Sequence, residues 1–309
     1  MMTTNTHIPV LLNEILEHLP LNSDSIYCDL TLGRAGHARE LLKKIPNGAL
    51  YGFDQDKSAL DYSKEVLSEI SPNFTLIHTN FVNAASELKG RGILEVDAVL
   101  LDIGVSSPMF DDPSRGFSYR NDGPLDMRMD QYNGRKTAAD VVNLYTLNEL
   151  IKIFREYGED KSAVRVANAI VEYRKSKPIT STLQLVDIIK EAKPARELRK
   201  KGHPAKQIFQ AIRIEVNDEL NVLKDTLNSM IPLLKKGGRL AVITFHSLED
   251  KIVKKIFRDH AVVIGNRNLP YQPEAKYRLV NRKVITPTEE EIEINPRAKS
   301  AKLRIIERK

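Results

Sequence analysis

Short apolar runs alternate with stretches of helical period over the first hundred residues. Runs that end on an acid or a turn predict strands at residues 26–29, 49–53, 74–78 and 96–103. The last run, VDAVLLDI, is almost continuously apolar, as expected for a parallel strand that is buried on both faces. Helical spacing follows over residues 38–44 and 56–70. This alternation predicts an α/β fold with a doubly wound sheet.

The pattern changes after residue 104. Residues 104–130 are rich in Gly, Pro, Asp and Arg and are too long for a simple connection. From about residue 138 to residue 193 the period is helical throughout, which predicts about four helices. We therefore expect a sheet domain of residues 1–116 and 203–309, with an inserted all-helical substrate domain of residues 117–202.

Three further elements are expected as the chain returns to the sheet. A long amphipathic helix over about residues 207–234 would end at Lys236-Gly237-Gly238. Residues 239–245 then predict a fifth strand. Near the C-terminus, residues 283–285 and 302–306 predict a closing antiparallel hairpin.

Composition narrows the class of protein. The 309 residues are 41% hydrophobic, which suits one large domain or one domain carrying a second. The net charge of +6 is spread along the chain, so it permits a polyanionic partner without requiring one. A single cysteine, Cys28, excludes a disulfide scaffold. With no apolar run of membrane-spanning length, we expect a cytoplasmic protein without a membrane partner.

The stretch IYCDLTLGRAGH at residues 26–37 has the order strand, glycine turn, helix. Such a turn lets backbone N–H groups approach a ligand, but this one does not match the dinucleotide fingerprint G-x-G-x-x-G. Asp29 at the strand end favours S-adenosylmethionine over NAD as the cofactor. Asp54 follows the next strand, where an acid commonly binds ribose hydroxyls. Taken alone, the stretch is also compatible with an ordinary βα turn.

Several motifs in fixed order carry a resemblance to a known family. They are HIPVLLNE at 7–14, DLTLGRAGH at 29–37, GFDQD at 52–56, LLDIGVSSP at 100–108, RGFSYRNDGPLDMRMD at 115–130, AIRIEVNDEL at 211–220, ITFHSLED at 243–250 and NPRAKSAKLRIIER at 295–308. The chain closely resembles the bacterial 16S ribosomal RNA cytosine-N4 methyltransferases from His7 to Arg308. The resemblance implies a Rossmann-like class I methyltransferase that uses S-adenosylmethionine. Its substrate would be a single cytidine in the decoding region of 16S rRNA, within the small ribosomal subunit.

The resemblance also implies a set of cofactor-binding positions. Carried over residue by residue, they are Ala35, Gly36, His37, Asp54, Phe81, Asp102 and Met109. Two of them depart from the family pattern. Ala35 stands where the family usually has Gly, and it would be strained at a positive φ. Met109 stands where the family usually has Gln, and it cannot contact adenosine as an amide would.

Methyl transfer to cytosine N4 requires positioning, because the N4 lone pair is delocalised into the ring. A hydrogen-bond acceptor on the exocyclic N–H would localise that lone pair. Residues 102–108 lie beyond the fourth strand and loosely resemble the D/S-P-P-aromatic loop of amino-directed DNA methyltransferases. We therefore expect Asp102, Ser106, Ser107 and Pro108 to form the N4-orienting loop, although Ser-Ser-Pro can also be a simple turn. Methylation of C5 would need a cysteine nucleophile, and Cys28 is expected in the core.

RNA recognition normally needs an unstacked base held against an aromatic ring. Candidate substrate-binding residues are Phe117, Tyr119, Arg120, Arg128, Lys200 and Lys201. The aromatic residues could instead pack a domain junction, and the basic residues could be plain solvated surface.

The sequence leaves open two alternative functions, the oligomeric state and the form of the RNA substrate. An NAD-type dehydrogenase is disfavoured by the missing fingerprint, and a non-catalytic ribosome-assembly factor would keep a cofactor-shaped pocket. His246 ends the fifth strand at the ligand edge, but no metal-ligand spacing occurs, so no metal is expected. A homodimer is compatible with the sequence, which does not decide between naked rRNA and the assembled subunit as substrate.

Overall fold

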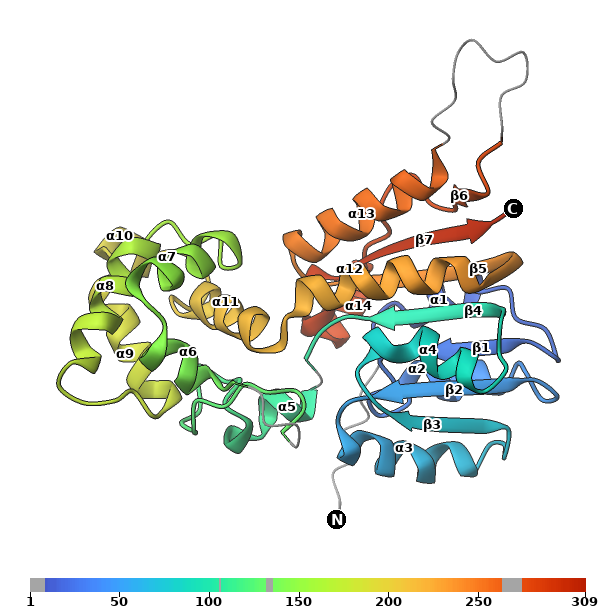
Figure 1. The fold of residues 1–309 in the computed structure, drawn as a ribbon, viewed down its shortest axis with the longest axis horizontal. Helices are drawn as coiled ribbons and strands as arrows, with labels where there is room; N and C mark the ends of the chain where they lie inside the picture. The colour runs from blue at the N-terminus through green and yellow to red at the C-terminus, as the bar shows by residue number, and fades with distance from the viewer. Residues whose placement is uncertain (1–8, 106, 132–135, 263–273) are drawn as a thin grey trace, which may run out of the picture. The chain divides into compact units, whose positions relative to one another are not determined.

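The computed structural model describes residues 9–105, 107–131, 136–262 and 274–309. Within it the chain forms two compact units (Figure 1). The sheet unit comprises the residues up to Gly104 together with Leu220–Lys309, and the helical unit comprises Val105–Glu219.

Seven strands form one sheet in the described part of the sheet unit (Figure 1). They are β1 (Ile26–Asp29), β2 (Ala49–Asp54), β3 (Phe74–His78), β4 (Val96–Asp102), β5 (Leu234–Thr244), β6 (Tyr277–Leu279) and β7 (Lys302–Arg308). Their order is β3-β2-β1-β4-β5-β7-β6. The first five pair in parallel, whereas β7 is antiparallel to both β5 and β6. The predicted doubly wound α/β sheet is confirmed.

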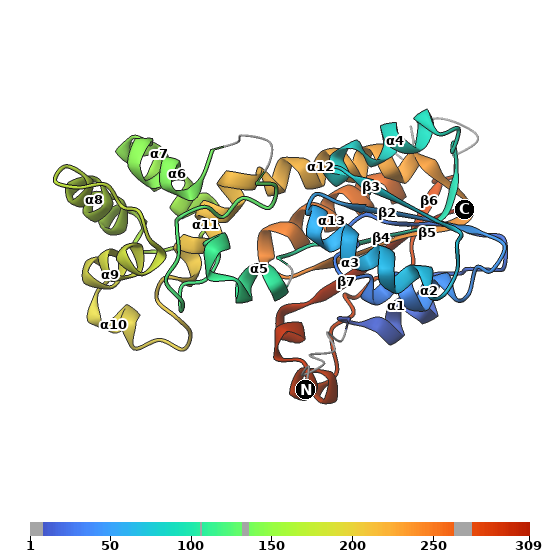
Figure 2. The same cartoon turned by 90° about the horizontal axis from the view of Figure 1, so that it is seen from below.

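Helices cover both faces of this sheet (Figure 2). One face carries α1 (Leu12–His18), α2 (Gly36–Leu42) and α3 (Lys57–Ser68); the other carries α4 (Ala84–Gly90), α12 (Glu219–Met230) and α13 (Ser247–Ala261). Alternate residues of the strands point to opposite faces and form two hydrophobic cores. Leu100 belongs to the core under α1, α2 and α3, whereas Cys28 and Leu101 belong to the core under α4, α12 and α13. This period of two explains why β4 reads as a continuous apolar run.

The predicted closing hairpin is wrong in one of its strands. β7 covers the predicted residues 302–306, but its antiparallel neighbours are β5 and β6. Of the other predicted strand, Ile285 makes an isolated bridge to Leu303. Two short helices, α14 (Glu289–Ile294) and the 3₁₀ helix η4 (Pro296–Ser300), precede β7.

The predicted single helix over residues 207–234 is also wrong. The structure has α11 (Lys206–Asn217) and then α12, separated by Asp218, whose φ of 50° is left-handed. After α12 the 3₁₀ helix η3 (Ile231–Leu233) contains Pro232, and β5 begins at Leu234. Gly237 and Gly238 lie within β5, where the register with β4 shifts between Val96 and Ala98. The glycines therefore mark a strand irregularity, not a helix end.

The helical unit has its own hydrophobic core. The predicted four helices over residues 138–193 are confirmed as α6 (Ala138–Leu144), α7 (Leu147–Glu156), α8 (Ala163–Arg174) and α9 (Thr182–Ala192). The unit also contains α5 (Ser107–Asp111), the 3₁₀ helix η2 (Pro113–Arg115), α10 (Ala195–Leu198) and α11.

This unit is larger than the predicted insertion of residues 117–202. It begins at Val105 because Met109, which precedes the predicted boundary, is buried in its core. It extends to Glu219 because α11 packs into the same core through Ile208, Phe209 and Ile212. The functional names given to the two domains stay predictions.

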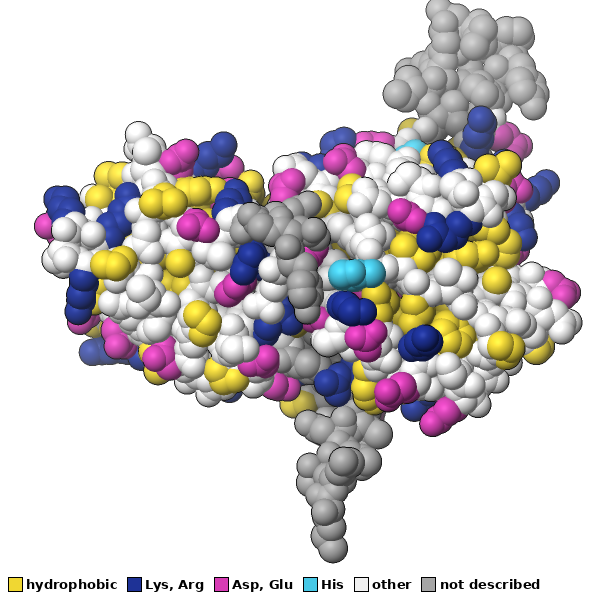
Figure 3. Space-filling view, turned by 60° about the horizontal axis from the view of Figure 1, so that its bottom comes forward, with side chains coloured by type: hydrophobic (Ala, Val, Ile, Leu, Met, Phe, Trp, Pro, Cys, Tyr) yellow, Lys and Arg dark blue, Asp and Glu magenta, His cyan; other side chains and the backbone are white. Residues whose placement is uncertain are grey.

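The surface adds two observations. Lys and Arg side chains are interspersed with Asp and Glu on the face shown in Figure 3, as the spread of charge along the sequence indicates. Among the described residues, every helix is too short or too polar to cross a bilayer.

Candidate active site

Three buried or half-buried acids end adjacent parallel strands at one edge of the sheet. Asp29 ends β1, Asp54 ends β2 and Asp102 ends β4, and both β2 and β4 pair in parallel with β1. The carboxyl edge of an open α/β sheet is where ligands bind. The sequence-predicted acids Asp54 and Asp102 therefore meet at the expected place.

Asp54 holds the glycine turn. Its Oδ2 accepts from the Gly33 N–H at 2.8 Å, and its Oδ1 accepts from the Asp56 N–H at 2.8 Å. On the other side of the turn, the buried Ser63 hydroxyl of α3 donates to the Gly33 carbonyl at 2.8 Å. Burial raises the pKa of Asp54 to about 6, although these N–H donors oppose the shift.

The turn ends at Ala35, which precedes α2 with a φ of 57°. This is the left-handed region, so the strain anticipated for Ala at a positive φ is present here. The Ala35 side chain is buried in the core under α2. A rigid, partly strained turn thus leads into the sequence-predicted Gly36 and His37.

His37 is buried and is held from the N-terminal side of the chain. Its Nε2 lies 2.8 Å from the carbonyl oxygen of Val10, and its Nδ1 lies 3.9 Å from Oδ2 of Asp102. A carbonyl can only accept, so Nε2 must carry a hydrogen. The orientation of His37 therefore depends on the segment that contains Val10.

Asp102 is the least satisfied of the acids. Its backbone N–H donates to the Thr31 hydroxyl at 2.7 Å, but its carboxylate Oδ1 is buried without a hydrogen-bond partner among the described residues. Burial, with the nearby charges of Asp29 and Glu249, raises the pKa of Asp102 to about 7. Burial likewise raises the pKa of Asp29 to about 7, although Tyr27 and Thr31 donate to it. Such a cluster favours a cationic ligand that also brings a donor.

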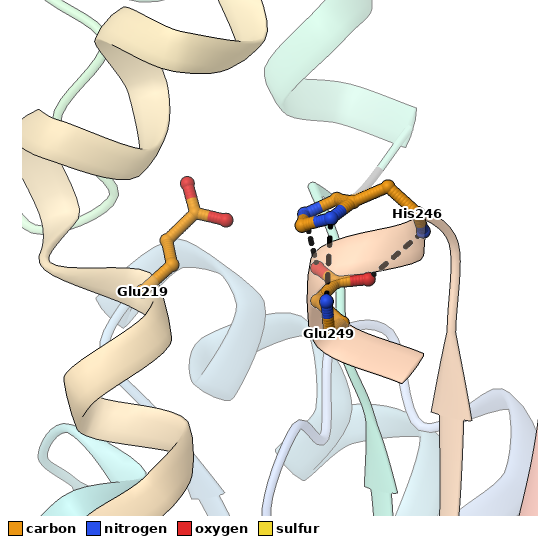
Figure 4. A group of neighbouring side chains, drawn as sticks. All are labelled: Glu219, His246 and Glu249. Carbon is orange, nitrogen blue, oxygen red and sulfur yellow. Dashed lines mark hydrogen bonds and ion pairs between the residues drawn. The ribbon is translucent and has the colours of Figure 1, made fainter. Parts of the chain in front are cut away.

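His246 and Glu249 lie at the same edge, where β5 passes into α13 (Figure 4). Ile243 of β5 pairs with Asp102, so His246 follows the neighbouring strand end, as expected. Glu249 is buried, its Oε2 accepts from the N–H groups of Phe245 and His246, and its Oε1 lies 2.9 Å from His246 Nε2. The pair caps the start of α13, so no nucleophilic triad arises from these residues.

The remaining predicted cofactor residues lie in different surroundings. Phe81 begins the 3₁₀ helix η1 (Phe81–Asn83) and packs half-buried against the sheet core. Met109 is 6% exposed and belongs to the core of the helical unit. Ser106 lies outside the described residues, and of Ser107 and Pro108 the structure describes the backbone, at the start of α5.

The predicted RNA-binding residues divide by their partners. Phe117 is buried in the helical core, and Arg128 makes a bidentate pair with Asp126 at 2.9 and 2.7 Å. Both therefore stabilise the unit, and a contact with a base is not needed to explain them. Tyr119 is half-buried and stacks on His203 with a centroid distance of 4.5 Å.

The basic residues are more accessible. Arg120, Lys200 and Lys201 are exposed, although Lys200 pairs with Glu197 at 2.7 Å. These cations are the predicted RNA contacts that the fold leaves exposed, whereas the Tyr119 ring is only partly accessible because it stacks on His203 and packs against the helical core.

Sequence reasoning gave no role in this site to four residues that shape it. Thr31 fixes the end of β4, Ser63 fixes the glycine turn, Glu249 adds charge beside Asp102, and Val10 orients His37. Val10, Thr31 and Glu249 stand inside recognised motifs and could have been singled out. Ser63 carries no sequence signal, because its role depends on how α3 packs.

The family model and the curated relatives match nearly the whole chain. A family model described as the MraW methylase family matches residues 4–309. The Ribosomal RNA small subunit methyltransferase H of Clostridioides difficile strain 630 is 48% identical over 307 residues, which is 98% of this chain and 98% of that protein. The protein of the same name from Streptococcus mutans is 49% identical over 308 residues, or 98% and 97%. A solved rRNA methylase structure from Streptococcus thermophilus is 12% identical, with a TM-score of 0.42 and coverage of 96% and 92%.

Proposed function

Because the chain belongs to the MraW methylase family, we propose that it is an S-adenosylmethionine-dependent rRNA methyltransferase. Its reaction is the N4-methylation of a single cytidine in the decoding region of 16S rRNA, within the small ribosomal subunit. S-adenosylmethionine, the cofactor, supplies a methyl group bonded to a positively charged sulfur. A ribosomal substrate also agrees with the expected cytoplasmic location.

One observation carries the fit of the site to this cofactor. The Asp102 Oδ1 atom is buried without a partner in a cluster of acids at the ligand-binding edge of the sheet. Burying such an atom unpaired is costly, and a donor on a cationic ligand would remove that cost. S-adenosylmethionine carries positive charge together with hydroxyl and amino donors, so its chemistry matches the unpaired Asp102 oxygen.

The residues have distinct proposed roles. Asp54 binds ribose hydroxyls, because a carboxylate that accepts two N–H groups still has free lone pairs. Gly36 and His37 line the cofactor beside Asp102, and Phe81 contributes an apolar wall. Met109 stays a prediction for the adenosine contact, since its side chain packs in the helical core.

The chemical step relies on positioning and on exclusion of water. We assign the orientation of cytosine N4 to Asp102 and the loop Ser106-Ser107-Pro108, whose acceptors would draw the N4 lone pair out of conjugation. A covalent route through cysteine has no support, because Cys28 is buried inside β1 and burial raises the pKa of its thiol.

On the RNA side, the helical unit is the proposed substrate-recognition domain. Tyr119 offers a ring for an unstacked base, and Arg120, Lys200 and Lys201 offer cations for phosphates. A homodimer stays a prediction, which sedimentation of the purified protein would test.

The decisive experiment uses purified protein, methyl-labelled S-adenosylmethionine and small ribosomal subunits from cells that lack the enzyme. Naked rRNA is assayed in parallel, and nucleoside mass spectrometry locates the label. We expect N4-methylcytidine on the subunits. Label on another nucleoside would overturn the N4 assignment, and no transfer despite tight cofactor binding would favour a non-catalytic assembly factor.

The orienting loop has its own test. Ser106→Ala and Pro108→Ala should lower turnover while S-adenosylmethionine still binds, because they alter the proposed acceptor loop. Full turnover in both variants would remove this loop from the mechanism.

A further inference from the structure

The N-terminal segment Pro9–Leu11 lies between the cofactor loop, by which we mean the glycine turn and its continuation into α2 (residues 33–37), and the C-terminal part of the sheet unit. Pro9 packs on Gly36 so closely that a Cβ placed at residue 36 would lie 2.7 Å from its Cγ. The Val10 carbonyl is 2.8 Å from His37 Nε2. The segment is thus in direct contact with two residues of the proposed cofactor site.

The segment is held in an unusual backbone conformation. Leu11 precedes α1 with a φ of 55°, in the left-handed region, and its side chain is fully buried. A bulky L-residue enters this region only when its surroundings impose it. The apolar Leu11 side chain makes no capping hydrogen bond at the start of α1, so the constraint comes from elsewhere.

Glu291 binds the backbone of this segment. The Leu11 N–H donates to Glu291 Oε1 at 2.7 Å, across 280 residues of sequence. Glu291 is itself fixed, because the Thr288 hydroxyl accepts from its backbone N–H at the start of α14. The following segment is anchored by Ala298 and Ala301, which are buried in the same core as Leu11 and Ala35.

We propose that Glu291 is a positioning residue for the cofactor loop. Its carboxylate holds Leu11 in the left-handed conformation, and this fixes the Val10 carbonyl that sets the tautomer and ring orientation of His37. The hydrogen on Nε2 points to Val10, so Nδ1 faces Asp102 at 3.9 Å. The inference rests on the proposed function, because it concerns the cofactor that this function uses.

Two substitutions of Glu291 distinguish the effect of its side-chain length from the effect of its charge. Glu291→Gln keeps the length and an acceptor oxygen but removes the charge, whereas Glu291→Asp keeps the charge and shortens the side chain by one methylene. If Glu291 acts by holding the Leu11 N–H, the Gln variant should behave like the parent protein. The Asp variant should bind S-adenosylmethionine roughly tenfold more weakly, an effect of the size expected for one lost hydrogen bond. Glu293→Asp, at an exposed position on the same helix, is the matched control.

Two measurements report the outcome on full-length protein. Calorimetry gives the affinity for S-adenosylmethionine, and ¹⁵N NMR of the imidazole rings gives the tautomer of His37, assigned with a His37→Asn variant. We expect the Nε2–H tautomer in the parent, Gln and control proteins, and a mixture in the Asp variant. Parental affinity and tautomer in Glu291→Asp would overturn the inference, as would equal impairment of the Gln and Asp variants.

Failure of this inference is distinguishable from failure of the proposed function. If the parent protein neither binds S-adenosylmethionine nor methylates subunits, the proposed function fails. If the parent does both and Glu291→Asp matches it, the role of Glu291 alone is rejected.

Discussion

At the scale of single residues, Ala35 replaces the Gly that is usual in the family at a backbone position with a positive φ. Its φ of 57° costs about 1–2 kcal/mol for an L-residue. Ala35→Gly would remove that cost but add about 0.5–1 kcal/mol of chain entropy and lose about 0.8 kcal/mol of methyl burial. We expect the Gly variant to change the free energy of unfolding by less than about 1 kcal/mol in urea titrations.

The same position supplies its own control. Ala35→Val places a β-branched residue where such residues are genuine outliers, so it should destabilise the protein by more than about 2 kcal/mol and weaken cofactor binding. A Val variant as stable as the Gly variant would contradict the left-handed conformation.

From the raised pKa of Asp102 we predict that the free energy of unfolding depends on pH. Burial raises its folded-state pKa to about 7, so the folded protein holds a proton that the unfolded chain has already lost. Stability without cofactor should therefore fall as the pH rises between about 4 and 7. Asp102→Asn removes the buried charge and should raise the free energy of unfolding at pH 8 by on the order of 1 kcal/mol, with little change at pH 4.

Urea unfolding at the two pH values measures this difference. Asp61→Asn, at an exposed position on α3, is the control and should show no such gain. The Asn variant should also lose cofactor affinity. A loss of stability at pH 8 in Asp102→Asn would mean that its carboxylate is already paired.

At the scale of elements, three helices of the helical unit, α6, α7 and α9, begin at side-chain caps. Thr137 and Asp140 form a capping box at the start of α6, in which each side chain binds the backbone N–H of the other. Thr137→Ala should lower the free energy of unfolding of the helical unit by about 1 kcal/mol. Lys152→Ala, an exposed change within α7, should be close to neutral. Circular dichroism during urea titration compares them, and equal effects would argue against the cap.

At the scale of the whole molecule, the helical unit is an insertion with a core of its own. The cluster that contains Met109, Phe154 and Ile212 lies entirely within residues 105–219. We expect a polypeptide of these residues to fold alone into a helical domain with a cooperative thermal transition, measured by circular dichroism. A shorter piece of residues 117–202 should not, since it lacks α11 and Met109. Cooperative folding of the shorter piece would instead support the boundaries predicted from sequence.

The sequence by itself determined the elements whose signals are local. Patterns among residues close in sequence predicted three features: the period of two in β4, the strand-turn-helix at residues 26–37 and the helical period over residues 138–193. The structure has these features at the predicted places. The acids at the strand ends could be predicted as well, because parallel strands bring their carboxyl ends to one edge.

Only the tertiary structure decided features that depend on distant contacts. The break at Asp218, the partner strands of β7 and the limits of the compact helical unit arise from packing between segments that the local pattern does not connect. The same holds for Ser63 on the glycine turn and for Glu291 on Leu11. Hydrophobic periodicity reports which face of an element is buried, but a hydrogen bond between residues far apart in sequence exists only once the chain has folded.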